Sequence, residues 1–168
     1  DAAGLLREAP FWGRLWDCAQ LESADRAYLA DLREDLAARL AALAPNLDYG
    51  LIHADLVREN VFVRGRDVAF IDFDDCGFGF RLFDLATTLL RNLREPDFPA
   101  LNAALLKGYA AVRPQAEREF AHLPLFLMLR ALTYIGWAAA RPELSDNAGR
   151  LRRYLADVRS LAEGLATA

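Results

Sequence analysis

The stretch LIHADLVRENVFVRGRDVAFIDFDD, residues 51–75, decides the fold of this chain. Three short apolar runs, YGLIH, NVFV and VAFID, have the length and the β-branched and aromatic content of strands. Residues 64–67 separate the last two runs by the spacing of a hairpin loop, and Gly65 suits its turn. Because the runs are brief, we expect a small β-hairpin in a mostly helical chain, and not a large sheet.

Polar side chains lie where these runs begin and end. His53, Asp55 and Asn60 fall between the first and second runs, and Asp72 and Asp74 end or follow the third. Loops that leave short strands often carry catalytic groups, because a rigid scaffold aims them. Asn60 and Asp72 are similarly far from the hairpin turn, so closing the hairpin is expected to bring them to the same end of it.

This set of residues suits a particular chemistry. An amide oxygen beside a carboxylate can hold a hard divalent cation such as Mg²⁺. Asp55, expected in the same pocket, could accept a proton from an attacking hydroxyl. Phosphoryl transfer requires such parts, because the enzyme mainly positions the nucleophile and neutralises phosphate charge. Asp74 and Asp75 allow two interpretations: solvated loop charges, or contacts to a substrate or second metal.

The segment HADLVREN followed by IDFDD resembles the catalytic loop and metal-binding segment of protein-kinase-like phosphotransferases. The resemblance is to the aminoglycoside phosphotransferase and choline kinase group, which includes bacterial homoserine-kinase-like enzymes. It implies that Asp55 is the catalytic base and that Asn60 and Asp72 bind Mg²⁺ at the phosphates of ATP. It also implies supporting roles for His53, which braces the loop, and for Asp84 of the FDLA segment, which anchors it.

The resemblance implies an α+β, mostly helical fold, the C-terminal lobe of a kinase. The activity it implies is ATP-dependent transfer of the γ-phosphate to a hydroxyl of a small molecule. Val57 stands where many protein kinases carry lysine, which disfavours a protein substrate. Asp74 replaces the glycine that follows Asp-Phe in protein kinases.

No glycine-rich phosphate loop or strand lysine is recognisable, and the one lysine, Lys107, falls in a predicted downstream helix. We therefore expect residues 1–168 to be a single domain from which the N-terminal nucleotide-binding lobe is absent. The isolated chain is then expected to have little kinase activity. It is also expected to expose apolar surface at the hairpin and at residues 11–16, through which copies could self-associate.

Two other functions remain open from the residues alone. One is a non-catalytic helical binding or regulatory module that keeps the kinase-like loop as scaffold. The other is a metal-dependent phosphohydrolase, because His-x-Asp with distant acids can also hold metals. That enzyme would need a further histidine or acid cluster, and the chain has only two histidines.

Composition narrows the class of protein. The content of 54% hydrophobic and 26% charged residues is typical of a soluble globular protein. A net charge of −4 without a basic block gives no reason to expect a nucleic-acid partner. Cys18 and Cys76 lack metal-ligand spacing and are expected to be reduced thiols of a cytoplasmic protein. Residues 123–140 approach the length of a membrane span, but the central Arg130 favours a core helix and no membrane.

The rest of the chain has helical periodicity. Residues 23–44 carry leucines at three- and four-residue intervals, with Ser23 as the expected N-cap. Further helices are predicted at residues 82–93, 98–111, 116–140 and 146–165. The segment GFGF, residues 77–80, is interpreted as a packed turn or a flexible segment over the substrate. Trp12 and Trp16 are expected to be packing anchors in an aromatic loop.

Overall fold

The structure is a computed structural model that describes residues 2–6, 8 and 10–166. The chain divides into two compact units. The first comprises Asp1–Asn46 with Met128–Ala168, and the second is Leu47–Leu127. All the candidate site residues lie in the second unit. The expectation of a single domain over residues 1–168 stays a prediction.

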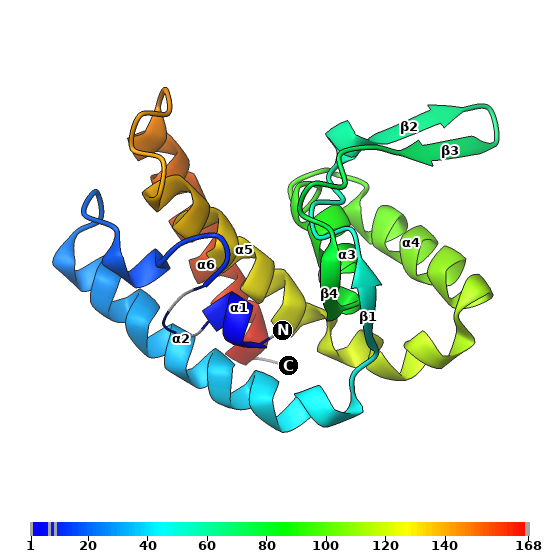
Figure 1. The fold of residues 1–168 in the computed structure, drawn as a ribbon, viewed down its shortest axis with the longest axis horizontal. Coiled ribbons are helices and arrows are strands. Elements are labelled where there is room, and N and C mark those ends of the chain that lie inside the picture. Colours follow the sequence, from blue (N-terminus) through cyan, green and yellow to red (C-terminus); the bar gives the residue numbers. More distant parts are fainter. Residues whose placement is uncertain (1, 7, 9, 167–168) are drawn as a thin grey trace. The chain divides into compact units, whose positions relative to one another are not determined.

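The second unit contains two antiparallel sheets of two strands each. Its strands are β1 (Tyr49–Ile52), β2 (Val61–Arg64), β3 (Asp67–Phe70) and β4 (Gly77–Phe80). Strand β2 pairs with β3 as a hairpin that extends away from β1 and β4 (Figure 1). At its end Arg64 faces Asp67, and Gly65 adopts a left-handed φ of 62°. The predicted hairpin and its glycine turn are confirmed.

Strand β4 corrects the interpretation of GFGF, which is neither a packed turn nor a flexible segment. It pairs with β1 so that Gly79 faces Gly50 and Phe78 faces Leu51. Glycine has a low propensity for strands, so the residue types of this segment gave no indication of the pairing. A Cβ at Gly79 would lie only 3.1 Å from Ile52 Cγ1, so the absence of a side chain there lets Ile52 pack against the strand.

Helices complete the second unit. They are α3 (Leu82–Leu90), α4 (Phe98–Val112) and the 3-10 helix η4 (Pro114–His122), with another 3-10 turn, η3 (Arg58–Asn60), before the hairpin. The buried side chains of this unit include Phe83, Leu85, Leu89 and Phe126. The ring of Phe80 in β4 lies 5.7 Å from that of Phe126 between centroids, in an edge-to-face arrangement. Strand β4 and the helical core are thus joined by aromatic packing.

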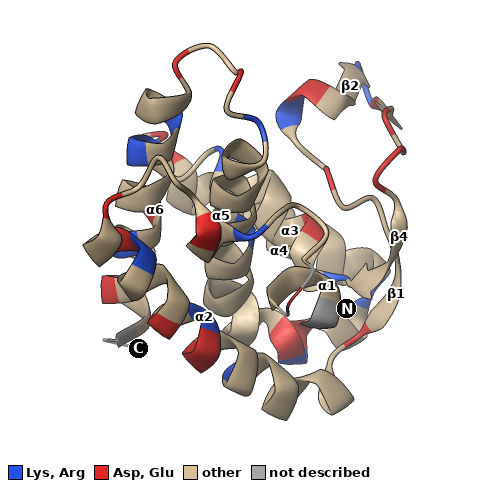
Figure 2. Ribbon diagram, turned by 60° about the vertical axis from the view of Figure 1, so that its left-hand side comes forward, with Lys and Arg blue, Asp and Glu red and all other residues tan. Residues whose placement is uncertain are grey.

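The first unit is helical. Its elements are α1 (Ala2–Leu6), η1 (Leu15–Asp17), α2 (Ser23–Leu43), η2 (Ala44–Asn46), α6 (Asn147–Ala166) and most of α5 (Leu123–Ala139). The leucine stripe of the predicted helix 23–44 is confirmed by the burial of Leu29, Leu36 and Leu40. Ser23 is not the N-cap: Glu22 holds that position and makes no side-chain capping bond. Acidic and basic residues are interspersed along α2 and α6 (Figure 2).

The predicted helix 116–140 is divided in two. Residues 114–122 are 3-10, and the α-helix begins at Leu123. Pro124 has no N–H to donate and is tolerated only in the first turn, which places the start of the α-helix there. Pro114–Ala139 is long and apolar enough for a membrane span by length and composition, but 67% of its most apolar window is buried within the structure. The buried core helix of a globular protein meets the same criteria of length and composition.

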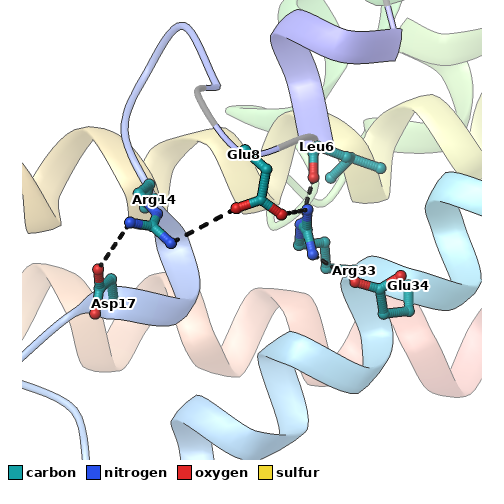
Figure 3. A network of polar contacts seen from close by, with 6 residues as sticks. All are labelled: Leu6, Glu8, Arg14, Asp17, Arg33 and Glu34. Atoms are coloured by element: carbon teal, nitrogen blue, oxygen red, sulfur yellow. Dashed lines mark hydrogen bonds and ion pairs between the residues drawn. The ribbon is translucent and has the colours of Figure 1, made fainter.

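The aromatic loop of the first unit is fixed by arginines. The guanidinium of Arg33 lies 4.1 Å from the ring centre of Trp16, and that of Arg14 lies 5.2 Å from it. Both arginines also pair with Glu8, and Arg33 donates to the carbonyl of Leu6 (Figure 3). Trp16 is therefore a packing anchor, as predicted.

Apolar side chains are exposed on the second unit. The exposed ones on the two sheets are Tyr49, Leu51, Phe62, Val63, Val68, Phe70 and Phe78. The expected exposure of the hairpin is confirmed. In the segment 11–16 only Phe11 is a large exposed hydrophobe, at 67%, whereas Leu15 is buried. Self-association through these surfaces stays a prediction.

Candidate functional site

The loop after β1 is held by one carboxylate. Asp84 Oδ2 accepts a hydrogen bond from the His53 amide, and Asp84 Oδ1 accepts one from the Ala54 amide, both at 2.8 Å. Ala54 is buried and has a left-handed φ of 68°, an uncommon conformation for a residue with a Cβ. Such strain persists only where surrounding contacts impose it, and the paired amides provide that restraint.

His53 joins this loop to the segment after the hairpin. Its Nε2 lies 2.9 Å from the carbonyl oxygen of Ile71, which can only accept, so Nε2 carries a proton and donates it. The ring is buried, and its centre lies 4.6 Å from that of Phe73. Among the described residues, none donates to its buried Nδ1. These contacts agree with the bracing role that the family resemblance implies.

Asn60 and Asp55 are in direct contact. The buried Asn60 side chain donates from Nδ2 to the backbone oxygen of Asp55 at 3.0 Å and to its Oδ2 at 3.3 Å. The Asp55 backbone oxygen also accepts from the Val57 amide, which tightens the turn. With Nδ2 directed at Asp55, the Asn60 Oδ1 points away from it and is the atom left to act as a ligand.

The hairpin brings Asp72 beside Asn60. The ladder pairs Val61 with Phe70, and one step beyond it the Ile71 amide donates to the Asn60 carbonyl at 3.1 Å. Asp72 follows directly, with a left-handed φ of 62° and an exposed side chain. Asn60 and Asp72 therefore lie at the same end of the hairpin, as their spacing predicts.

Asp74 and Asp75 lie in the turn between the hairpin and β4. Asp74 is exposed and Asp75 is half-buried, and the Cys76 amide donates to the Phe73 carbonyl to close this turn. Both interpretations of these carboxylates, solvated charges or contacts to substrate or second metal, stay predictions.

The donor set is compatible with a magnesium ion shared with phosphates. Within the described part of the chain, no three His, Cys, Asp or Glu side chains are grouped to form a protein-only metal site. Asn60 and Asp72 offer one amide oxygen and one carboxylate. Mg²⁺ in phosphoryl-transfer sites is typically bound by one or two carboxylates, with substrate phosphates and water completing the shell. The residues present therefore fit Mg²⁺ with a bound nucleotide and do not form a cage for a lone metal.

Two supporting contacts were missed in the sequence analysis. Thr88 Oγ1 donates to the Leu56 carbonyl at 3.0 Å, and Thr88 is one helical turn after Asp84 on α3. The i, i+4 spacing places both on one helix face, so this signal was present in the sequence. The second is an ionic cluster around Asp48, which accepts from Arg81 at 3.3 Å and from Arg113 at 2.5 Å. No local pattern connects those positions.

Tyr109 lies beside this cluster and provides a test at alkaline pH. Burial raises the pKa of Tyr109 above its ordinary value, and burial does the same to the pKa of Tyr28. A folded-state pKa above the unfolded one means that the neutral phenol stabilises the fold. That stabilisation is present below about pH 10, the unfolded pKa, and is lost as pH rises through the folded pKa.

We therefore expect the free energy of unfolding to fall above about pH 10. Tyr109→Phe should make this fall less steep, with Tyr28 responsible for part of what remains. Urea denaturation of both proteins between neutral and alkaline pH measures the effect. An identical alkaline fall in the variant would contradict the contribution of Tyr109.

A mostly helical lobe with this loop, hairpin and Asp84 anchor defines the class of kinase-like phosphotransferases. The model of the phosphotransferase enzyme family matches residues 2–123, and the chain belongs to that family. Over 132 residues the chain is 33% identical to a homoserine kinase from Brucella canis, an alignment that covers 75% of this chain and 40% of that enzyme. The fold-class prediction is confirmed.

Two solved structures are similar in fold. A microcompartment-associated aminopropanol kinase superposes with a TM-score of 0.84 and 29% identity, over 99% of this chain and 53% of that one. An amicoumacin kinase in complex with AMP-PNP and Ca²⁺ superposes with a TM-score of 0.66 and 24% identity, over 89% and 49%. The chain thus spans about half or less of the length of these relatives.

Proposed function

We propose that the protein containing this chain is an ATP-dependent kinase that transfers the γ-phosphate to a hydroxyl of a small molecule. The observation that carries the proposal is the position of Asn60. Its side chain contacts Asp55 while its backbone pairs with the residue before Asp72. One residue thereby connects a candidate base to a candidate pair of metal ligands, which is the arrangement that phosphoryl transfer needs.

Each residue has a proposed role. Asp55 accepts the proton of the attacking hydroxyl and orients it. Asn60 Oδ1 and the Asp72 carboxylate would hold Mg²⁺, which neutralises phosphate charge when bound with ATP. Asp84 and His53 keep the loop in its strained conformation. Asp55 and the ligands then need little rearrangement when the substrates bind.

The names of two relatives indicate which class of small molecule could accept the phosphate. Homoserine kinase and aminopropanol kinase are both named for small molecules that carry a hydroxyl and an amino group. We propose an amino alcohol or hydroxylated amino acid as the acceptor, in a cytoplasmic enzyme. Nucleic acid and membrane are not proposed as partners.

The test is a substrate panel with the full-length protein. ATP consumption and acceptor phosphorylation are measured with Mg²⁺ for amino alcohols, hydroxylated amino acids, aminoglycosides and sugars. Phosphorylation of an amino alcohol or hydroxylated amino acid is the expected result. The isolated 168-residue chain should show little turnover, given its share of the relatives' length. No phosphorylated product from any acceptor would favour the non-catalytic module.

A metal titration tests Asp72. Asp72→Asn keeps the size of the side chain but weakens it as a ligand for a hard cation. The Mg²⁺ concentration for half-maximal activity should rise by about tenfold or more, since even outer-shell changes at metal sites cost about that much. Asp67→Asn, at the far end of the exposed hairpin, is the matched control. An unchanged Mg²⁺ requirement in Asp72→Asn would remove Asp72 from the ligand set.

A further inference from the structure

Arg81 connects strand β1 to the start of α3. It follows β4 directly, and its amide donates to the carbonyl of Asp48 at 3.0 Å, which extends the β1–β4 ladder by one step. Its side chain turns back over β1. Nε donates to Asp48 Oδ1 at 3.3 Å, and Nη1 donates to the carbonyl of Leu51 at 2.8 Å.

The space around Gly50 independently shows where the Arg81 side chain lies. A Cβ placed on Gly50 would lie 2.7 Å from Arg81 Cζ and would overlap the guanidinium. The guanidinium therefore passes over the residue between its two partners, and only glycine leaves room for it. By contrast, a Cβ placed on Gly77, in the paired strand, meets no atom within 4 Å.

Asp48 is itself fixed by other elements. Its Oδ2 accepts from Arg113 at 2.5 Å, at the end of α4, and its amide donates to Glu119 Oε1 at 3.0 Å, in η4. Two arginines and two carboxylates balance in charge. The side chains of Asp48, Arg81 and Arg113 are only 20%, 28% and 32% exposed, so solvent screens them less than an ordinary surface pair.

The position of Arg81 bears on the candidate catalytic loop. Strand β1 leads directly into His53 and Ala54, whose backbone amides donate hydrogen bonds to the Asp84 carboxylate. The Asp84 amide donates to the Arg81 carbonyl at 3.2 Å in the turn that begins α3. Arg81 thus contacts both the strand that leads into the donor amides and the turn that carries the acceptor.

We propose that Arg81 is a positioning residue of the phosphotransferase site, holding β1 against the start of α3 so that the loop from His53 to Asp55 keeps its geometry. This inference rests on the proposed function for its catalytic consequence. Arg81 acts through β1 and Asp84 and has no role in contacting the reacting atoms. Asp48 holds the guanidinium of Arg81 in place, and Arg113 and Glu119 in turn fix Asp48.

The experiment compares three variants of the full-length protein. Arg81→Ala removes the guanidinium, and Arg81→Lys keeps the charge but cannot span Asp48 and Leu51 in the same way. Gly50→Ala displaces the guanidinium while leaving every charge in place. Gly77→Ala makes the same glycine substitution on the paired strand, where there is space, and serves as the control.

Amide hydrogen exchange provides a readout that does not depend on activity. In Arg81→Ala and Gly50→Ala, the amides of His53 and Ala54 should exchange at least about tenfold faster, as local opening becomes easier. Amides of α6 and the Gly77→Ala control should keep their protection. Unchanged exchange at His53 and Ala54, or an equal loss of protection throughout the protein, would overturn the positioning role.

Kinetics provide the second readout. In Arg81→Ala we expect kcat to fall about ten- to hundredfold, because small displacements of catalytic groups have effects of that size. KM for ATP and for the acceptor should stay within about twofold, and Arg81→Lys should recover part of kcat at most. Turnover at the wild-type kcat in Arg81→Ala overturns the inference and leaves the proposed function intact. Absence of product in the wild type, with faster exchange at His53 and Ala54 in the variants, overturns the proposed function and retains the structural role.

Discussion

Asp55→Asn in the full-length protein is expected to lower kcat by about 10²–10⁴-fold without loss of the fold. The amide has nearly the size of the carboxylate but cannot accept the proton of an attacking hydroxyl. The loop should remain in place, because the contacts from Asp84 involve the amides of His53 and Ala54 and do not involve the Asp55 side chain. Steady-state kinetics and thermal unfolding of the variant measure both expectations.

The matched control for Asp55→Asn is Asp97→Asn, which changes an exposed carboxylate that makes no capping bond at the start of α4. It should keep wild-type kcat and unfolding temperature. Asp55→Asn with unchanged turnover would exclude Asp55 as the base. A variant that instead unfolds would show that the Asn60–Asp55 contact supports the structure more than the chemistry.

Asp84→Ala is expected to reduce both stability and activity. Its carboxylate accepts hydrogen bonds from two backbone amides, and hydrogen bonds to a charged group contribute about 1.5–3 kcal/mol each. Because the side chain is half-buried, water can replace part of the loss, and we expect a decrease of about 2–4 kcal/mol in the free energy of unfolding. The left-handed Ala54 then loses its restraint, so kcat should fall as well.

Asp84→Asn separates the two effects. The amide oxygen can still accept one of the two backbone hydrogen bonds, so its loss of stability should be about half that of Asp84→Ala. Urea unfolding with a kinetic assay of the same samples measures the series, with Asp97→Asn again as control. Equal stability of Asp84→Ala and the wild type would show that the loop does not depend on this carboxylate.

Local patterns in the sequence were sufficient for much of the fold. The leucine stripe of α2 and the hairpin with Gly65 in its turn were both predicted, because helix periodicity and turn chemistry act between near neighbours. The juxtaposition of Asn60 and Asp72 followed from the same hairpin, since the register of a short turn determines which residues meet at its open end. Asp84 as an anchor came from the family resemblance and matches its two amide contacts.

Other features had no local signal. Strand β4 is a glycine-rich segment that becomes a strand only because β1 is available to pair with it. The cluster of Asp48, Arg81 and Arg113 joins residues 33 and 65 positions apart in the chain. The path of Arg81 over Gly50 is likewise visible only once both elements are placed.

By itself, the sequence determined most of the helices, the hairpin and the residue types of a phosphotransferase loop, because these depend on spacing along a few turns or strand residues. Tertiary structure alone decided how the loop is held: the left-handed Ala54 under the Asp84 carboxylate, the amide of Asn60 turned toward Asp55, and Arg81 lying across β1. Those contacts depend on the packing of β1 against β4 and α3. Packing brings together backbone groups and charges whose separation in sequence carries no information about their distance in space.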